Sequence, residues 1–255
     1  MPIRRDGSSV PLSRRTRARG TLLAMMAALA LLLVAPRGAI AAATPFEDSR
    51  MIIEFNSSAQ DIGIQFFIDS EGAKSVDIFS PAGDKVYSVQ AKGRLLSQGG
   101  ASEMFVESAE PTLSELPLSK FFTRFPAGKY KFVGVAPDGS PIQGTATFNH
   151  RIPKGPTINE PVTGASKCAK SVAIPAVIGW DPVTQGINGQ PITIVGYEVI
   201  VENSEVFDVH LPGDATQLTI SAEFLEPKTD YIFEVLAIAD GGNQTITEGC
   251  FSTAP

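Results

Sequence analysis

The stretch FLEPKTDYIFEVLAI, Phe224–Ile238, decides the fold of the last third of this chain. It is typical of a turn that leads into a β-strand, because Pro227 restricts the backbone and an alternating run follows. Every second residue of that run shares one face, which we assign to the core: Tyr231, Phe233, Val235 and Ala237. A buried tyrosine has an apolar ring and a hydroxyl group that needs a hydrogen-bond partner. The stretch therefore predicts a strand whose buried tyrosine needs a hydrogen-bond partner.

Short strand patterns separated by turn residues continue through residues 155–255 and predict an all-β sandwich. An apolar run ends at Trp180 before Asp-Pro, and GYEV opens an alternating segment at Gly196. Leu218, Ile220, LEPKTDY, FEVLAI and a closing FST follow in order. This order resembles the fibronectin type III family, which implies a seven-stranded sandwich of two sheets.

The resemblance implies structural roles for four residues of this domain. Trp180 would pack on the inner layer, and Leu225 would pack beneath the ring of Tyr231. The Tyr231 hydroxyl would bond to the backbone a few residues upstream, which pins the corner where the chain crosses between the sheets. Pro227 would restrict the turn at that corner.

The preceding residues also have strand patterns, with one helical exception. GKYKFVGVAPDGSPIQGTATF predicts a hairpin that turns at Pro137-Asp138-Gly139. Four apolar residues at helical spacing predict a short helix that caps the sandwich: Leu118, Phe121, Phe122 and Phe125. FPAGKYKFVGVAPDG resembles a bacterial immunoglobulin-like module. We therefore predict two tandem β-sandwich domains, immunoglobulin-like over 44–152 and fibronectin type III over 153–255, joined at the proline-rich segment HRIPKGPTINEP.

Residues 1–43 have the three-part layout of a secretory signal peptide: a basic segment, the apolar run TLLAMMAALALLLVAP, and small residues. We expect cleavage after Ala41 or Ala43; the alternative is an uncleaved anchor, for which the run is short. Cleavage removes seven of the 21 basic residues and one of the 27 acidic ones, leaving a net charge of −12. Such a chain repels nucleic acids and anionic membranes. We expect an exported protein, periplasmic or extracellular.

The sequence contains two cysteines, Cys168 and Cys250. In an exported protein an even pair favours a disulfide over two buried thiols. Two cysteines and two histidines are too few for a structural zinc site without carboxylate ligands.

No sequence motif of catalysis or cofactor binding occurs, so we predict no enzyme and no cofactor. His150 and His210 fall in different domains and are interpreted as surface histidines. The loop EFNSSAQDIG carries Glu54, Asn56 and Asp61, whose oxygens suit calcium, but it lacks the spacing of a calcium loop and is interpreted as a solvated acidic loop. Carboxylate pairs of the kind that hydrolyse glycans cannot be recognised from sequence.

The sequence favours a non-enzymatic protein that binds or scaffolds an unknown protein or glycan through its loops. The candidate loops are Pro182–Pro191, Asp240–Thr245 and the turn Pro137–Pro141. One alternative is a glycan-acting enzyme or its accessory module. The other is a periplasmic two-sandwich chaperone, which needs an exposed edge strand and a basic anchor, for which Arg151 and Lys154 are the candidates.

Overall fold

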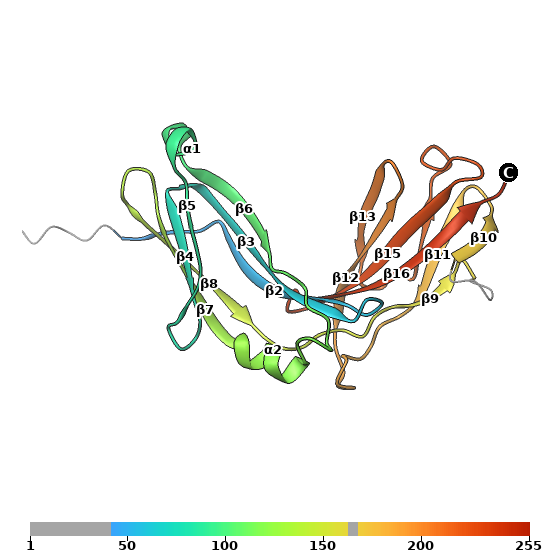
Figure 1. Cartoon of the computed structure of the whole chain (residues 1–255), viewed down its shortest axis with the longest axis horizontal. Coiled ribbons are helices and arrows are strands. Elements are labelled where there is room, and N and C mark those ends of the chain that lie inside the picture. Colours follow the sequence, from blue (N-terminus) through green and yellow to red (C-terminus); the bar gives the residue numbers. More distant parts are fainter. Residues whose placement is uncertain (1–41, 163–167) are drawn as a thin grey trace, which may run out of the picture. The chain divides into compact units, whose positions relative to one another are not determined.

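The computed structural model describes residues 42–162 and 168–255, and most of its regular structure is β-sheet (Figure 1). Residues 1–41 of the predicted signal peptide lie outside the described residues. Among the described helices, none has the length and apolar character that a membrane crossing requires.

The first eight strands form an N-terminal sandwich. They are β1 (Thr44–Pro45), β2 (Asp48–Asn56), β3 (Asp61–Ala73), β4 (Ser75–Phe79), β5 (Lys85–Gln90), β6 (Ala101–Glu107), β7 (Gly128–Val135) and β8 (Pro141–Phe148). Two short helices interrupt them, α1 (Gly93–Gln98) and α2 (Leu118–Arg124). One sheet has the order β1-β8-β7-β4-β5, and the other contains β2-β3-β6.

The last eight strands form a C-terminal sandwich. They are β9 (Thr157–Glu160), β10 (Cys168–Val172), β11 (Ala176–Asp181), β12 (Ile194–Glu202), β13 (Val206–Pro212), β14 (Gln217–Ile220), β15 (Asp230–Ala239) and β16 (Gln244–Thr253). One sheet has the order β14-β11-β9, and the other contains β13-β12-β15-β16, with β10 also paired to β16.

The two sandwiches have the same strand order. When the short strands β1 and β10 are set aside, each sandwich pairs its first, second and fifth strands in one sheet and its other four strands in the second sheet. The predicted fold class, two tandem β-sandwiches, is confirmed. This order does not distinguish an immunoglobulin-like first domain from a fibronectin type III-like one, because the first sandwich has the same strand order as the second. The predicted boundary at 152/153 stays a prediction, since strand pairing continues across it.

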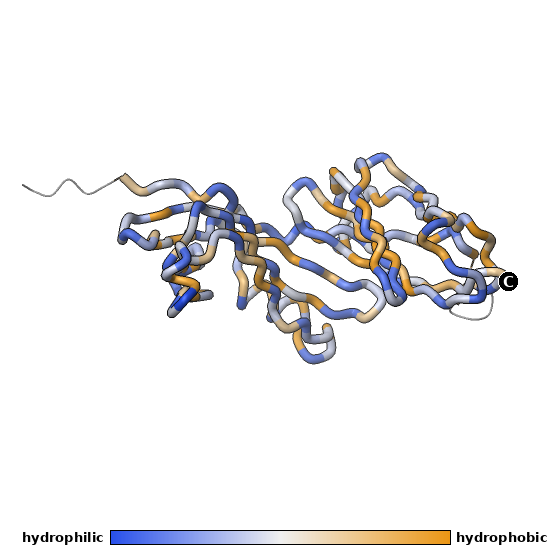
Figure 2. Tube along the Cα trace, turned by 90° about the horizontal axis from the view of Figure 1, so that it is seen from above, coloured by the Kyte–Doolittle hydropathy of each residue, from blue (hydrophilic) through white to orange (hydrophobic). Residues whose placement is uncertain are grey.

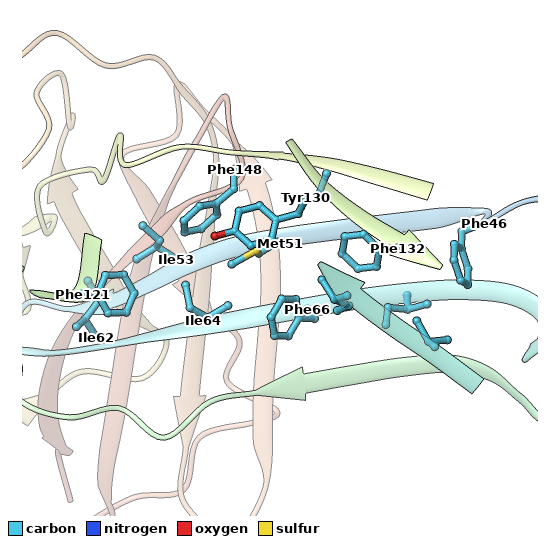
Figure 3. Close-up of a cluster of buried hydrophobic side chains, with 14 of the residues drawn as sticks. Phe46, Met51, Ile53, Ile62, Ile64, Phe66, Phe121, Tyr130, Phe132 and Phe148 are labelled. Atoms are coloured by element: carbon cyan, nitrogen blue, oxygen red, sulfur yellow. The ribbon is translucent and has the colours of Figure 1, made fainter. Parts of the chain in front are cut away.

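Each sandwich has its own buried core, and hydrophobic positions recur along the strands of both (Figure 2). Figure 3 shows the N-terminal core, where Ile53 of β2 and Ile64 of β3 lie opposite Tyr130 of β7 and Phe148 of β8. The predicted helix is confirmed as α2, and its Phe121 is buried in this core. Phe122 and Phe125 pack against the same cluster, so the aromatic stripe closes the core.

The C-terminal core contains the residues that the opening stretch assigns to it. Tyr231, Phe233, Val235 and Ala237 are all buried there, together with Leu225. The Tyr231 hydroxyl accepts a hydrogen bond from the Glu226 backbone N–H at 2.8 Å. Trp180 is fully buried, with its ring centroid 5.2 Å from that of Tyr197.

Tyr130 is also bonded to the turn before it in the N-terminal sandwich, but as a donor. It is fully buried, and its hydroxyl donates to the Pro126 carbonyl at 3.0 Å. The sequence signal is the spacing shared by PAGKYKF, Pro126–Phe132, and PKTDYIF, Pro227–Phe233. In each sandwich, therefore, a core tyrosine is hydrogen-bonded to the backbone just before its strand, β7 or β15.

The predicted disulfide is confirmed: Cys168 of β10 is bonded to Cys250 of β16, with a Cα–Cα distance of 4.6 Å. The two cysteines are direct partners in a parallel pairing of these strands. Because the bridge spans 82 residues of sequence, it constrains a large loop of the unfolded chain. The disulfide links β10 covalently to β16, the last strand of the fold.

Replacing either core tyrosine by phenylalanine should lower the free energy of unfolding by about 1–3 kcal/mol, because a partly buried backbone group loses its partner. Tyr231→Phe leaves the Glu226 N–H unpaired, and Tyr130→Phe leaves the Pro126 carbonyl unpaired. Urea unfolding measures both changes. Tyr87→Phe, at a partly exposed ring, is the matched control and should stay within about 0.5 kcal/mol. Unchanged midpoints for both core variants would contradict this account of the corners.

Candidate functional site

One sheet runs through both sandwiches (Figure 1). The start of β16 pairs in parallel with the end of β2, so that Gln244 lies beside Glu54 and Ile246 beside Asn56. The strand order is therefore β13-β12-β15-β16-β2-β3-β6, with β10 on the far part of β16. We call this assembly the shared sheet. Its inner faces cover the two cores, and its outer face is a single surface built from both sandwiches.

The amide side chain of Asn243 joins the two halves of the shared sheet. It is 1% exposed, and its Oδ1 accepts the Ile53 backbone N–H at 2.9 Å. Its Nδ2 donates to the Asn149 and Arg151 carbonyls, each at 3.0 Å. One side chain from the β15–β16 turn therefore bonds to β2 and to the segment that follows β8.

Neighbouring contacts complete this joint. Thr245 is fully buried, and its Oγ1 donates to the Pro153 carbonyl at 2.7 Å. Ser57 donates from both its backbone N–H and its Oγ to the Ile246 carbonyl. Gly241 allows the close approach, since a Cβ there would lie 2.4 Å from Nδ2 of Asn149.

The joint buries part of the three loops that the sequence analysis proposes as binding surfaces. The loop Asp240–Thr245 is the β15–β16 turn, and its Asn243 and Thr245 are buried against the N-terminal sandwich. Asn243 begins a pattern for N-glycosylation, and its burial removes it from solvent. The loop Pro182–Pro191 is held to the linker, because Ile187 N–H donates to the Ile152 carbonyl at 3.0 Å, although its tip stays exposed. The turn Pro137–Pro141 is exposed at Pro137, Asp138 and Gly139.

The outer face of the shared sheet forms a groove of about 690 Å³, which we call the sheet groove. Side chains from β13, β12, β15, β16, β2, β3 and β6 line it. Its apolar residues come from both sandwiches: Ile52, Phe67, Phe105, Ile200, Leu236, Ile238 and Ile246. Ile52 and Leu236 are buried although they point away from both cores, so they form its floor.

An exposed aromatic stack lies on the β3–β6 side of the sheet groove. The rings of Phe67 and Phe105 have centroids 5.0 Å apart. The Arg50 guanidinium carbon lies 4.4 Å from the Phe67 centroid, in a cation–π contact. Phe105 is 56% exposed, a large apolar area to leave in water on a strand. The stack therefore offers a surface on which a ligand can pack.

Carboxylates line the rest of the sheet groove, and their environment disfavours their negative charge. Burial raises the pKa of Glu234 to about 7, and repulsion from Glu248 and Glu202 adds to this. Burial also raises the pKa of Glu54, which is 8% exposed and accepts a hydrogen bond from Gln244. Burial raises the pKa of Glu198, against the attraction of His210.

More acidic groups lie beside the groove. Burial raises the pKa of Glu110 to about 7, with Glu54 and Glu107 adding repulsion. Glu54, Glu107 and Glu110 place carboxylate oxygens within 4.8 Å of one another, as do ligand atoms of a second group, Glu198, Asp208 and His210. Carboxylates of the first group already bond to Gln65 and Gln244, so the residues supply oxygen ligands but no vacant cage.

The histidines and the acidic loop are placed as follows. His150 Nε2 lies 2.8 Å from the Phe125 carbonyl, and its ring stacks on Phe122 at 4.1 Å. In the loop that starts at Glu54, Asn56 Oδ1 accepts the backbone N–H groups of Ser58 and Ala59, so it shapes the turn. Glu54 accepts a hydrogen bond from Gln244, whereas Oδ1 of Asp61 is buried without a hydrogen-bond partner among the described residues.

Sequence reasoning missed the sheet groove, although one signal was available. Met51-Ile52-Ile53 and Val235-Leu236-Ala237-Ile238 are apolar runs without alternation. A continuous apolar run indicates a strand covered on both faces. The pairing of these two strands through β16 explains the pattern.

Comparisons with known proteins add little to this geometry. No protein-family model and no curated protein matches the sequence. A two-domain fibronectin type III segment of chicken tenascin is 13% identical, over 82% of this chain and 99% of that one, with a TM-score of 0.29. A tetra-tandem repeat from the extending region of a large adhesion protein is 10% identical over 81% and 49%, at 0.27. The spore cortex lytic enzyme SleM of Clostridium perfringens is 19% identical over 40% and 28%, at 0.28. The fold therefore rests on the strand order itself.

Replacing Asn243 by alanine should lower the free energy of unfolding by about 1–3 kcal/mol, because the buried Ile53 N–H and two carbonyls lose their partner. Urea unfolding measures the change, and amide hydrogen exchange at Ile53 should accelerate. Asn188→Ala, in the exposed tip of the loop Pro182–Pro191, is the matched control, for which we expect little change. Unaltered exchange at Ile53 in Asn243→Ala would contradict the role of this amide.

Glu234→Gln should stabilise the protein at about pH 8 and have little effect near pH 4.5. Because the folded state raises this pKa from 4.5 to about 7, it binds the proton more tightly than the unfolded chain does. Stability is therefore lost as pH rises through that window, and a neutral side chain avoids the loss. We expect a gain of the order of 1 kcal/mol, since water screens the groove.

Thermal unfolding at the two pH values measures this difference. Glu223→Gln, at an exposed turn, should shift the midpoint little at either pH. A gain from Glu234→Gln of equal size at both pH values would show that it does not arise from the raised pKa.

Proposed function

We propose that this chain is an exported, non-enzymatic binding protein and that the sheet groove holds its ligand. The observation that carries the proposal is the groove itself, whose floor comes from both sandwiches and is fixed by the pairing of β2 with β16. Phe105 supplies exposed aromatic area at one end. Large exposed aromatics beside a concave surface are typical of binding sites.

Export is supported by the disulfide between Cys168 and Cys250, since such bonds persist in oxidising compartments. The basic, apolar and small-residue layout of residues 1–43 supports the same route. The chaperone alternative has less support, because its basic candidates have other contacts. Arg151 pairs with Asp240 at 3.2 Å, and Lys154 Nζ donates to Gln185 at 3.0 Å.

Glycan hydrolysis is the alternative that one observation favours. Burial raises the pKa of Glu234 to about 7, which suits a general acid, and other carboxylates stand beside it. The same raised pKa follows from crowding of acids on an open sheet face, which needs no catalytic role. Experiment has to separate the two explanations.

Capture of partners from the export compartment tests the proposal, with the secreted chain as bait. We expect a stoichiometric partner whose affinity falls about ten-fold or more in Phe105→Ala, the expected loss at a central aromatic contact. Leu95→Ala, an exposed apolar residue of α1 outside the groove, is the matched control and should retain the partner.

A panel of glycans incubated with the same chain provides the opposing test. Turnover that Glu234→Gln abolishes would overturn the non-enzymatic proposal. Equal capture by the wild type and Phe105→Ala would remove the groove as the binding surface.

A further inference from the structure

We propose that the sheet groove binds an extended polypeptide segment in which basic and apolar side chains are interspersed. The inference rests on the proposed function, because it names the chemical class of the ligand for the same groove. It is argued from the order of side chains on the outer face, from the balance of charge there, and from one contact that the groove already contains.

Acidic and apolar side chains are interspersed on the outer face across the strands. Glu198 of β12 is the direct partner of Leu236 on β15, whereas Ile200 is the direct partner of Glu234. Leu236 in turn is paired with Ile246 of β16. Direct partners across antiparallel strands stand about 5 Å apart. Glu234 is paired with Glu248. The surface therefore offers acidic and apolar contacts side by side within one groove.

Acidic and apolar side chains are also interspersed along the strands. In β15 the outward residues are Ile232, Glu234, Leu236 and Ile238, because every second residue shares a face. Their spacing is about 6.6–6.8 Å, two residues of strand rise. An extended polypeptide repeats its own side chains at this same spacing, so its lysine or arginine and apolar residues can meet the acidic and apolar positions in register.

The negative charge of the groove lacks internal compensation among the described residues that line it. Glu54, Glu198 and Glu234 face two basic groups, Arg50 and His210. Arg50 is already paired with Asp48 at 2.6 Å, and His210 Nε2 is 3.5 Å from Glu198. The carboxylates repel one another in a partly dehydrated place, and a ligand that brings cations relieves that repulsion.

The contact between Arg50 and Phe67 shows how a basic side chain packs on this face. Its guanidinium lies over the ring at 4.4 Å, and the next ring, Phe105, is exposed. A ligand arginine or lysine can lie on Phe105 in the same manner, with its methylene groups on the apolar floor. Anionic lipids and nucleic acids carry the wrong charge for the groove. Neutral glycans can donate hydrogen bonds to its carboxylates but bring no cation to offset their charge.

Binding of synthetic peptides to the secreted chain tests the inference. The probe is a labelled peptide of the repeat Gly-Lys-Leu. Gly-Glu-Leu reverses its charge, and Gly-Lys-Ser removes its apolar groups. We expect saturable binding of Gly-Lys-Leu by fluorescence anisotropy, weakened by salt, with both comparison peptides at least about ten-fold weaker.

Two double variants locate the site. Glu198→Gln with Glu234→Gln should weaken binding of Gly-Lys-Leu about ten-fold or more, because two facing charges are lost. Glu205→Gln with Glu223→Gln removes the same charge from exposed positions outside the groove and should leave affinity unchanged. Thermal unfolding confirms that both are folded. Equal binding by the two double variants would overturn the inference, as would equal binding of the Gly-Glu-Leu peptide.

The outcome separates this inference from the proposed function. If the natural partner depends on Phe105 while Gly-Lys-Leu does not bind, the groove is a binding surface for another ligand class, and only the inference fails. If calcium displaces Gly-Lys-Leu at low concentration, the acidic groups select small cations, and the inference also fails. If Phe105→Ala affects neither ligand, both fail.

Discussion

The buried amide of Asn243 is the interaction on which the candidate site depends. It satisfies the Ile53 N–H of β2 and two carbonyls of the segment after β8, all from one turn of the C-terminal sandwich. A buried backbone donor without a partner is costly. The two sandwiches are therefore joined by specific hydrogen bonds as well as by the covalent linker.

This joint changes what the β-sheet can do. If the two sandwiches were separate, β16 and β2 would each have an open edge at this point. An open strand edge is a site of unwanted pairing. Here β16 and β2 pair with each other, and the outer face extends across both sandwiches. Residues that would be scattered surface apolars on separate domains, such as Ile52 and Leu236, become the floor of one groove. Glu54 joins the acids of the C-terminal sandwich for the same reason.

Much of the fold follows from local sequence. The stretch around Tyr231 predicts its strand, its core face and the need for a hydroxyl partner, because all three depend on residues close in the chain. The helix at Phe121 follows from spacing alone. The corner at Tyr130 was equally predictable from the shared Pro-x-x-x-Tyr-x-Phe spacing, and the apolar run at Ile52 indicated a strand covered on both faces.

The groove and its joint could not be derived in this way. Asn243 and Ile53 are 190 residues apart, and nothing local distinguishes an asparagine in a glycine-rich turn that binds solvent from one that binds a second sandwich. The acids of the groove come from β12, β15 and β2, and Glu54 of β2 adds its repulsion to that within the C-terminal sandwich only once β16 has paired with β2. Long-range strand pairing therefore determines the site, whereas local pattern determines the sandwiches.

Residual dipolar couplings of backbone amides test the central claim of a shared sheet most directly. If β2 and β16 pair in solution, couplings from β3 and β7 and couplings from β12 and β15 fit one alignment tensor. Two tensors of different magnitude would show that the sandwiches reorient independently, and the sheet groove would not exist as one surface.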